Sequence, residues 1–198
     1  MQYWGNKMTN RSIKEPFVLK IVVVGDKNTK KTKLLRTYIY GKQENRLSFK
    51  GTIGVDIHTI MKEFDIKKVG RIKIHIAIFE LASDLRFSDV RSEFYKGAKG
   101  AIVCFDMDKE NTLFNTRNWV NEILDNLGKI PVVLVGCIDN SNNKKIPIKA
   151  VQSVIKELES LLGYSLPYIE ISITSPSEMD KVFEKLVEMI INRLIQER

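Results

Sequence analysis

A cluster of glycine, lysine and threonine follows the first strongly apolar stretch of the chain. Residues 25–32 read Gly-Asp-Lys-Asn-Thr-Lys-Lys-Thr, close to the phosphate-binding pattern GxxxxGK[ST]. In that pattern backbone N–H groups cradle phosphates, the lysine contacts the outer phosphates and the hydroxyl binds Mg²⁺. Gly25, Lys31 and Thr32 match, whereas Lys30 stands where the second glycine belongs. The predicted phosphate site comprises Gly25, Asp26, Lys27, Asn28, Thr29, Lys30, Lys31 and Thr32.

The neighbouring elements place this cluster between a buried strand and a helix. Residues 17–24 form a β-branched apolar run, typical of a buried parallel strand. Residues 32–40 carry apolar side chains at helical spacing: Leu34, Leu35, Tyr38 and Ile39. Two lysines at a helix start oppose the helix dipole, and a bound phosphate would remove that conflict. The alternative interpretation is a cationic loop without a ligand.

The rest of the chain alternates strands with helices. Alternating apolar positions over 55–61 and 72–78, joined by a short connection with Gly70, predict an antiparallel pair. This alternation puts His58 and His75 at polar positions, which we expect to be exposed. Further strands are predicted at 101–105, 130–135 and 167–172, between amphipathic helices at 113–127, 151–162 and 179–194.

These elements predict the α/β fold class. We expect a doubly wound sheet of six mostly parallel strands, one of them antiparallel, with about five helices. Residues 1–15 are predicted to be an N-terminal extension and residues 16–198 a single domain. In such folds ligands bind at the carboxyl ends of the strands, where the 25–32 cluster stands.

Composition narrows the function classes. The net charge is +8, but the basic residues are scattered and not interleaved with exposed aromatics, so we expect no nucleic-acid partner. No apolar run approaches the ~20 residues of a membrane span. Two cysteines in apolar runs suit a reducing cytoplasm. The last residues, Gln196, Glu197 and Arg198, include no cysteine, so we expect no prenyl anchor, and any membrane contact would need a partner or a weak basic patch.

Several further segments resemble the Rab and Ras proteins of the small GTPase superfamily. Residues 51–56, Gly-Thr-Ile-Gly-Val-Asp, are similar to the first-switch motif TIGVDF. Residues 79–87, Phe-Glu-Leu-Ala-Ser-Asp-Leu-Arg-Phe, align without gaps to WDTAGQERF, and residues 94–98 resemble YYRGA. The similarity runs from about residue 17 to the end of the chain and implies the P-loop small GTPase fold.

The resemblance implies a guanine nucleotide site with Mg²⁺ as cofactor. Carried over by position, Lys31 would contact the β- and γ-phosphates. The implied metal ligands are Thr32, Thr52 and, through a water, Glu80 at the position of the family aspartate. Residues 41–56 and 82–98 would be the switch regions that meet effector or regulator proteins.

Other nucleotide-handling positions depart from the family pattern. Lys30 replaces a glycine, at a cost of ~1–2 kcal/mol if the position is left-handed. Ser83 replaces the glycine whose N–H meets the γ-phosphate. Asp84 replaces the glutamine that orients the attacking water, and a carboxylate there would repel the γ-phosphate. We therefore expect slow or impaired GTP hydrolysis.

The guanine-recognition motifs are also altered. The family NKxD becomes Cys137-Ile138-Asp139-Asn140, so Asn140 replaces the aspartate that accepts two hydrogen bonds from guanine. Each lost charge-assisted bond is worth ~1.5–3 kcal/mol. In place of ETSAK the chain keeps Ser172, and Ile173 offers only its backbone N–H.

Two interpretations of function remain open. One is a Rab/Ras-like molecular switch that binds GTP or GDP with Mg²⁺ and hydrolyses GTP slowly. The other is a pseudo-GTPase that acts as a nucleotide-independent interaction module. A minor variant of the first is altered base choice, because Asn140 could donate to a carbonyl where guanine has an amino group.

Overall fold

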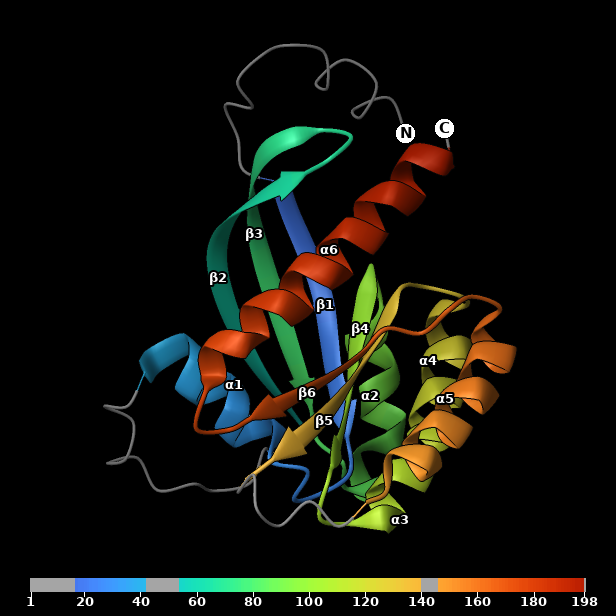
Figure 1. Cartoon of the computed structure of the whole chain (residues 1–198). Coiled ribbons are helices and arrows are strands. Elements are labelled where there is room, and N and C mark those ends of the chain that lie inside the picture. The colour runs from blue at the N-terminus through green and yellow to red at the C-terminus, as the bar shows by residue number, and fades with distance from the viewer. Residues whose placement is uncertain (1–16, 42–53, 140–145, 198) are drawn as a thin grey trace.

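The computed structural model describes residues 17–41, 54–139 and 146–197. They form one six-stranded sheet in the order β2-β3-β1-β4-β5-β6 (Figure 1). The strands are β1 (Phe17–Gly25), β2 (Val55–Ile66), β3 (Gly70–Leu81), β4 (Gly100–Asp106), β5 (Val132–Ile138) and β6 (Tyr168–Ser172). Only β2 runs antiparallel to its neighbour β3, and the other pairs are parallel. The predicted fold class is confirmed.

The helices cover both faces of the sheet. They are α1 (Lys31–Tyr40), α2 (Ser88–Tyr95), α3 (Glu110–Phe114), α4 (Thr116–Leu127), α5 (Ile148–Leu162) and α6 (Met179–Gln196), with short 3₁₀ turns at Leu85–Phe87 and Pro176–Glu178. Figure 1 shows α1 and α6 on one face and α2, α4 and α5 on the other. The helix predicted over 113–127 is divided into α3 and α4 at Asn115, whose side chain donates a hydrogen bond to Asp26 at 2.7 Å.

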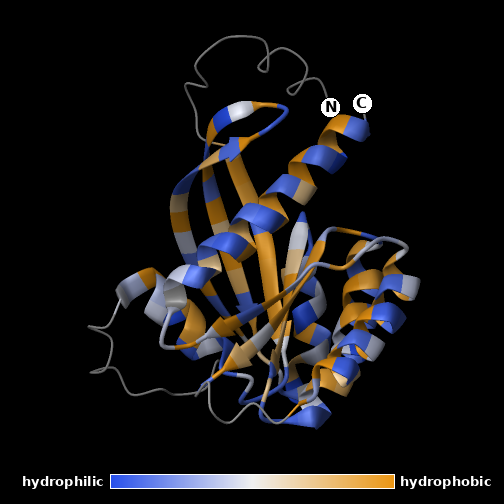
Figure 2. Cartoon of the chain, in the orientation of Figure 1, coloured by the Kyte–Doolittle hydropathy of each residue, from blue (hydrophilic) through white to orange (hydrophobic). Residues whose placement is uncertain are grey.

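Two apolar clusters fill the space between the sheet and its helices. One joins the inner faces of β1 and β3 to α1 and α6 through residues such as Leu34, Ile76 and Phe183. The other joins β4 and β5 to α2, α4 and α5 through residues such as Phe105 and Val151. Figure 2 shows the apolar central strands enclosed by helices whose outer surfaces are polar. This rigid sheet fixes the positions of the loops that follow β1, β3, β4 and β5.

The inward-facing side chains of strand β2 are not the ones that we predicted: the alternation is shifted by one residue. Ile57 and Met61 are more than half exposed, at 56% and 53%, whereas His58 is buried at 6%. The prediction that His58 is exposed is therefore wrong, and His75 is half-buried rather than exposed. The physical reason is that Phe64 and Ile66, which share the phase of His58, are buried at 3% and 5% and turn this face of β2 inward. His58 then meets a polar partner from α1, since the Tyr40 hydroxyl lies 3.2 Å from its Nδ1.

Among the residues that the structure describes, no helix has the length and apolar character needed to cross a bilayer.

Candidate functional site

The loop between β1 and α1 begins at a glycine that the packing requires. Gly25 has φ 146°, and a Cβ built on it would lie 2.2 Å from the carbonyl oxygen of Cys104 on β4. Only glycine therefore allows β1 to approach β4 so closely at this point. Lys31 starts the helix, is buried, and donates from Nζ to the Asp26 carbonyl oxygen at 3.4 Å. The lysine stem thus folds back over the loop.

Two residues of this loop are non-glycine residues with positive φ. Lys30 has φ 67° and Asn28 has φ 65°, a backbone conformation that costs roughly 1–2 kcal/mol for a residue with a Cβ. Lys30 is therefore in the left-handed conformation for which the family pattern has glycine. No side chain caps the start of α1 within the described residues.

The side chain of Lys30 turns to the loop after β4. Its Nζ lies 2.7 Å from Asp106 Oδ1 and 3.1 Å from Asp108 Oδ2. Burial acts to lower the pKa of Lys30, but the hydrogen bonds and charges of the two carboxylates outweigh it and raise the pKa above its usual value. Asp106 is fully buried and has a second cation, Lys109 Nζ, 3.5 Å from its Oδ2. The sequence analysis did not identify this ion pair, whose partners lie 76 and 78 residues apart in the chain.

Asp26 and Thr29 shape the loop from within. The Asp26 carboxylate accepts hydrogen bonds from Asn115 Nδ2 at 2.7 Å and from Trp119 Nε1 at 2.8 Å. Thr29 is fully buried and its hydroxyl donates to the Asp26 carbonyl at 2.9 Å. The Asp26 side chain therefore ties the loop to α4, and only its backbone is available to a ligand.

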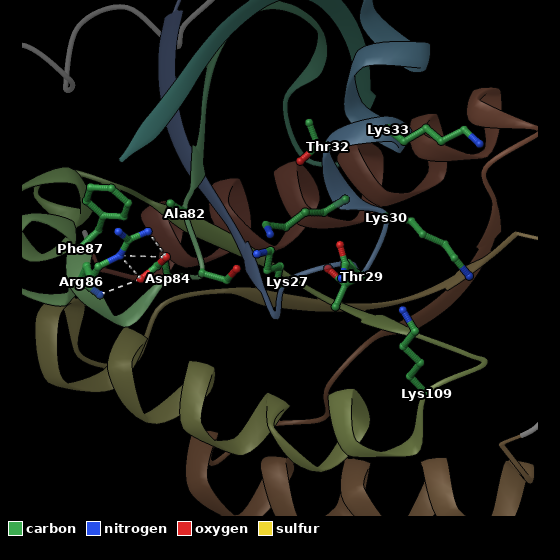
Figure 3. Close-up of a pocket in the computed structure, with 13 residues that line it drawn as sticks. Lys27, Thr29, Lys30, Thr32, Lys33, Ala82, Asp84, Arg86, Phe87 and Lys109 are labelled. Atoms are coloured by element: carbon green, nitrogen blue, oxygen red, sulfur yellow. Dashed lines mark hydrogen bonds and ion pairs between the residues drawn. The ribbon is translucent and has the colours of Figure 1, made fainter. Parts of the chain in front are cut away.

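A cationic cavity of about 720 Å³ opens over the loop. Figure 3 shows lysine side chains from the loop and α1 on one side and the Asp84–Arg86 pair on the other. Among the described residues, its charged lining consists of Lys27, Lys30, Lys31, Lys33, Arg86, Lys109 and one acid, Asp84. Asn28, Thr29, Thr32, Ala82, Ser83 and Phe87 complete the wall. The structure thus brings together all predicted phosphate-site residues from Lys27 to Thr32, together with Ser83 and Asp84.

Two of the predicted metal ligands, Thr32 and Glu80, are hydrogen-bonded to each other at the edge of this cavity. The Thr32 hydroxyl donates a short hydrogen bond to Glu80 Oε1, and Glu80 at the end of β3 is fully buried. The longer glutamate side chain therefore still reaches the position next to the P-loop hydroxyl. Thr52, the third predicted ligand, lies outside the described residues.

The acid that replaces the family glutamine is neutralised by its neighbour. Asp84 accepts hydrogen bonds from the backbone N–H of Arg86 at 3.0 Å and from its guanidinium at 2.7 Å. These bonds, with the charge of Lys27 adding to them, lower the pKa of Asp84 to about 2. The carboxylate is thus ionised at neutral pH, but its charge is balanced by the Arg86 guanidinium. Sequence reasoning identified the acid and not its partner two residues away.

A buried arginine holds the segment that carries Ser83 and Asp84. Arg91 on α2 donates to the carbonyl oxygens of Ala82 at 3.1 Å and Asp84 at 3.0 Å. Its guanidinium also pairs with Glu122 on α4 at 2.7 Å. The turn after β3 is therefore anchored to the helical layer.

The predicted base-recognition residues lie at the ends of β5 and β6. Cys137 is buried, and Asp139 Oδ1 is exposed, 3.9 Å from Lys33 Nζ. The Ser172 hydroxyl hydrogen-bonds with that of Thr174 at 2.7 Å, and the Ile173 N–H donates to the Ile138 carbonyl at 2.9 Å. Asn140 lies outside the described residues. None of the described base-side residues lines the cationic cavity.

Comparisons with known proteins agree with this geometry. The profile of the Ras family matches residues 20–192. Ras-related protein Rab-27B of Bos taurus is 24% identical over 189 residues, which cover 91% of this chain and 83% of the relative. Ras-related protein Rab-27A of Homo sapiens is 25% identical over 186 residues, and that of Canis lupus familiaris 26% over 187, each covering 90% of this chain and 80% of the relative. The chain therefore belongs to the Ras family, within the small GTPase superfamily.

Proposed function

We propose that this protein is a Rab/Ras-like switch that binds a guanine nucleotide with Mg²⁺ in the cationic cavity and hydrolyses GTP slowly. The observation that carries the proposal is the charge of the cavity, whose described lining has five lysines and one arginine against one aspartate. Lys30, Lys33, Arg86 and Lys109 are ion-paired with aspartates, which leaves Lys27 and Lys31 as the cations of the described lining that are available to a ligand. Like charges gathered in one cavity repel each other, and a polyphosphate would relieve that repulsion. Membership of the Ras family makes a nucleotide the expected source of the polyphosphate.

Phosphate contacts come from the loop and the first turn of α1. Lys31, held over the loop by its bond to the Asp26 carbonyl, would meet the outer phosphates. The backbone N–H groups at the start of α1 would take the inner ones. Lys30 contributes little here because Asp106 and Asp108 already engage its amino group.

The residues present fit a Mg²⁺ ion beside these phosphates. Oxygen donors suit Mg²⁺, and the Thr32 hydroxyl and the buried Glu80 carboxylate lie together at the cavity edge. Thr32 would be a direct ligand, Thr52 would join it in the triphosphate state, and Glu80 would hold a metal-bound water. Such an ion would supply charge that offsets the phosphates.

Hydrolysis is expected to be slow because of Asp84. A water-positioning amide can both donate and accept hydrogen bonds, whereas an ionised carboxylate only accepts them. Asp84 is moreover engaged by Arg86. The residue therefore cannot replace the family glutamine in orienting water.

Membership of the Ras family supports the proposal that the protein binds effector or regulator proteins. Residues 41–56 and 82–98 would present the surface for effector or regulator proteins. We further propose a cytoplasmic location, with peripheral membrane contact through a partner.

The test begins with denaturing freshly purified protein and identifying any released nucleotide by chromatography and mass. Calorimetry with GDP and GTP in the presence of Mg²⁺ would follow. Lys31→Ala should weaken binding ~10–100-fold, since a hydrogen bond to a charged group is worth ~1.5–3 kcal/mol. Lys185→Ala is the matched control, because it removes the same charge from an exposed position on α6. No nucleotide in the protein and no binding at high micromolar concentration would refute the proposal.

The alternative is a pseudo-GTPase that interacts with partners without nucleotide. The observation that favours it is that groups needed by a nucleotide already have partners: the Ile173 N–H bonds Ile138, and the Lys30 amino group bonds two aspartates. A folded but empty protein whose melting temperature stays unshifted in millimolar GTP and Mg²⁺ would select this function.

A further inference from the structure

A row of polar contacts runs between helix α1 and the hairpin of β2 and β3, from the buried Glu80 to the exposed Tyr40. Three α1 residues one turn apart each face a polar residue of the hairpin: Thr32 faces Glu80, Arg36 faces Asp56, and Tyr40 faces His58. Asp56 and Glu80 are directly paired across the two strands, and His58 lies two residues further along the same face of β2. The hairpin therefore gathers an imidazole and two carboxylates on one inward face.

The α1 partners leave two buried atoms of this group without a hydrogen bond. Glu80 Oε1 is engaged by Thr32, but Glu80 Oε2 has no hydrogen-bond partner in the described structure. His58 Nδ1 is next to the Tyr40 hydroxyl, while Nε2 has none. The side chains of Glu80 and His58 are 0% and 5% exposed. A fully buried carboxylate is costly unless it is paired or coordinates a metal, and one neutral hydroxyl donor does not compensate it.

The distance between these two atoms is close to the distance between two ligand atoms of one metal ion. Glu80 Oε2 and His58 Nε2 are 4.0 Å apart, too far for a hydrogen bond. Zinc bonds of about 2.0–2.1 Å at a tetrahedral angle place two ligand atoms about 3.4 Å apart. A side-chain movement of roughly 0.6 Å would therefore bring both atoms within bonding distance of one ion. A carboxylate oxygen of Asp56 completes a set of three ligand atoms within 4.8 Å of one another.

We propose that Asp56, His58 and Glu80 form a binding site for a divalent transition-metal ion of the Zn²⁺ type. Imidazole nitrogen suits zinc and its neighbours in the first transition row and is a poor ligand for Mg²⁺. Tyr40 orients the histidine: a hydrogen bond from His58 Nδ1–H to the Tyr40 hydroxyl leaves the lone pair of His58 Nε2 directed at the metal. Arg36 Nη2, 3.5 Å from Asp56 Oδ2, offsets part of the negative charge of the site.

This site shares Glu80 with the proposed Mg²⁺ site but has its other ligands to itself, and it does not rest on nucleotide binding. Glu80 serves the two sites with different oxygens, Oε1 toward Thr32 and Oε2 toward His58. The transition-metal site therefore predicts binding by nucleotide-free protein.

The experiment is a titration of the full-length, chelator-stripped and nucleotide-free protein with Co²⁺, followed through its visible ligand-field bands. We expect one Co²⁺ per chain, displaced by Zn²⁺ but not by a large excess of Mg²⁺. His58→Gln should weaken Co²⁺ binding at least ~10–100-fold, since even loss of a supporting residue has that effect. Tyr40→Phe should weaken it ~10-fold and tests the same geometry if the His58 variant fails to fold.

His75→Gln is the matched control, because the chain has only two histidines and His75 projects from β3 on the opposite face from Glu80. It should bind Co²⁺ as the unchanged protein does. Lys31→Ala should lower nucleotide affinity and leave Co²⁺ binding intact, which separates this inference from the proposed function. Absence of Co²⁺ bands, equal binding by the His58 variant, a thiolate charge-transfer band from Cys104 or Cys137, or displacement by equimolar Mg²⁺ would each overturn the site.

Discussion

Replacing Lys30 by the family's glycine should destabilise this protein, although the substitution removes backbone strain. Lys30 has φ 67°, so Lys30→Gly relieves about 1–2 kcal/mol. The same change takes a cation away from Asp106, which is fully buried and 2.7 Å from Lys30 Nζ. Removing one partner of a buried ion pair typically costs about 3–5 kcal/mol.

The difference between these two effects gives the expected result. Lys109 Nζ remains 3.5 Å from Asp106 Oδ2 and compensates part of the charge, so the cost falls toward the lower end of its range. We expect a loss of about 1–3 kcal/mol in the free energy of unfolding, or about 2–12 °C in melting temperature for a chain of this length.

The assay is urea denaturation of the nucleotide-free protein, combined in a double-mutant cycle with Asp106→Asn. The asparagine removes the buried charge while keeping the shape of the side chain. Lys30→Gly should therefore be much less damaging in the Asp106→Asn background. A Lys30→Gly variant at least as stable as the unchanged protein, or the same loss in both backgrounds, would refute the reasoning.

Three other predictions follow from the same structure. Asp84 should titrate near pH 2 when its carboxyl group is followed by carbon-detected NMR, and Arg86→Ala should return the midpoint toward the ordinary aspartate value. Because the pKa of Asp84 is depressed, its contribution to stability is present above the ordinary aspartate pKa and is lost as the pH falls through about 2. If the nucleotide proposal holds, Asp84→Gln should raise single-turnover GTP hydrolysis at least ~10-fold, whereas an unchanged rate would show that this position does not limit the reaction. Gly25→Ala should lose at least ~2 kcal/mol in urea denaturation because its Cβ would meet the Cys104 carbonyl oxygen at 2.2 Å, and near-normal stability would contradict that close approach.

The sequence predicted the fold because each element carries a complete local pattern. The apolar run of β1, the apolar stripes of α4, α5 and α6, and the glycine at the start of β3 are all local signals. The phase of β2 was wrong because the alternation was judged on residues 55–61 alone. Phe64 and Ile66 share the phase of His58 and are buried at 3% and 5%, so the apolar inner face of the strand lies in its second half. Over the first half the inward positions are polar, and Asp56 and His58 face Arg36 and Tyr40 of α1.

The same limit applies to the site. The positions of Lys30, Asp84 and Glu80 were predictable from spacing, and their departure from the family pattern was visible. Their partners were not, because Asp106 and Asp108 lie more than 70 residues from Lys30 and His58 lies on another strand from Glu80. Only Arg86, two residues from Asp84, was near enough to be found from the sequence by local charge pairing.

Those partners bear on what the altered residues mean. If these positions had only lost their role in nucleotide binding, nothing would require the new charged side chains to have partners of opposite charge. Here Lys30 has two carboxylates within 3.1 Å, Asp84 has a guanidinium within 2.7 Å, and Glu80 has a threonine hydroxyl on one side and an imidazole on the other. Three of the departures from the family pattern, Lys30, Asp84 and Glu80, thus each have a complementary group nearby. The cavity still keeps Lys31, Thr32 and a strongly positive lining, so an anion remains the ligand that its chemistry fits, whatever base that anion carries.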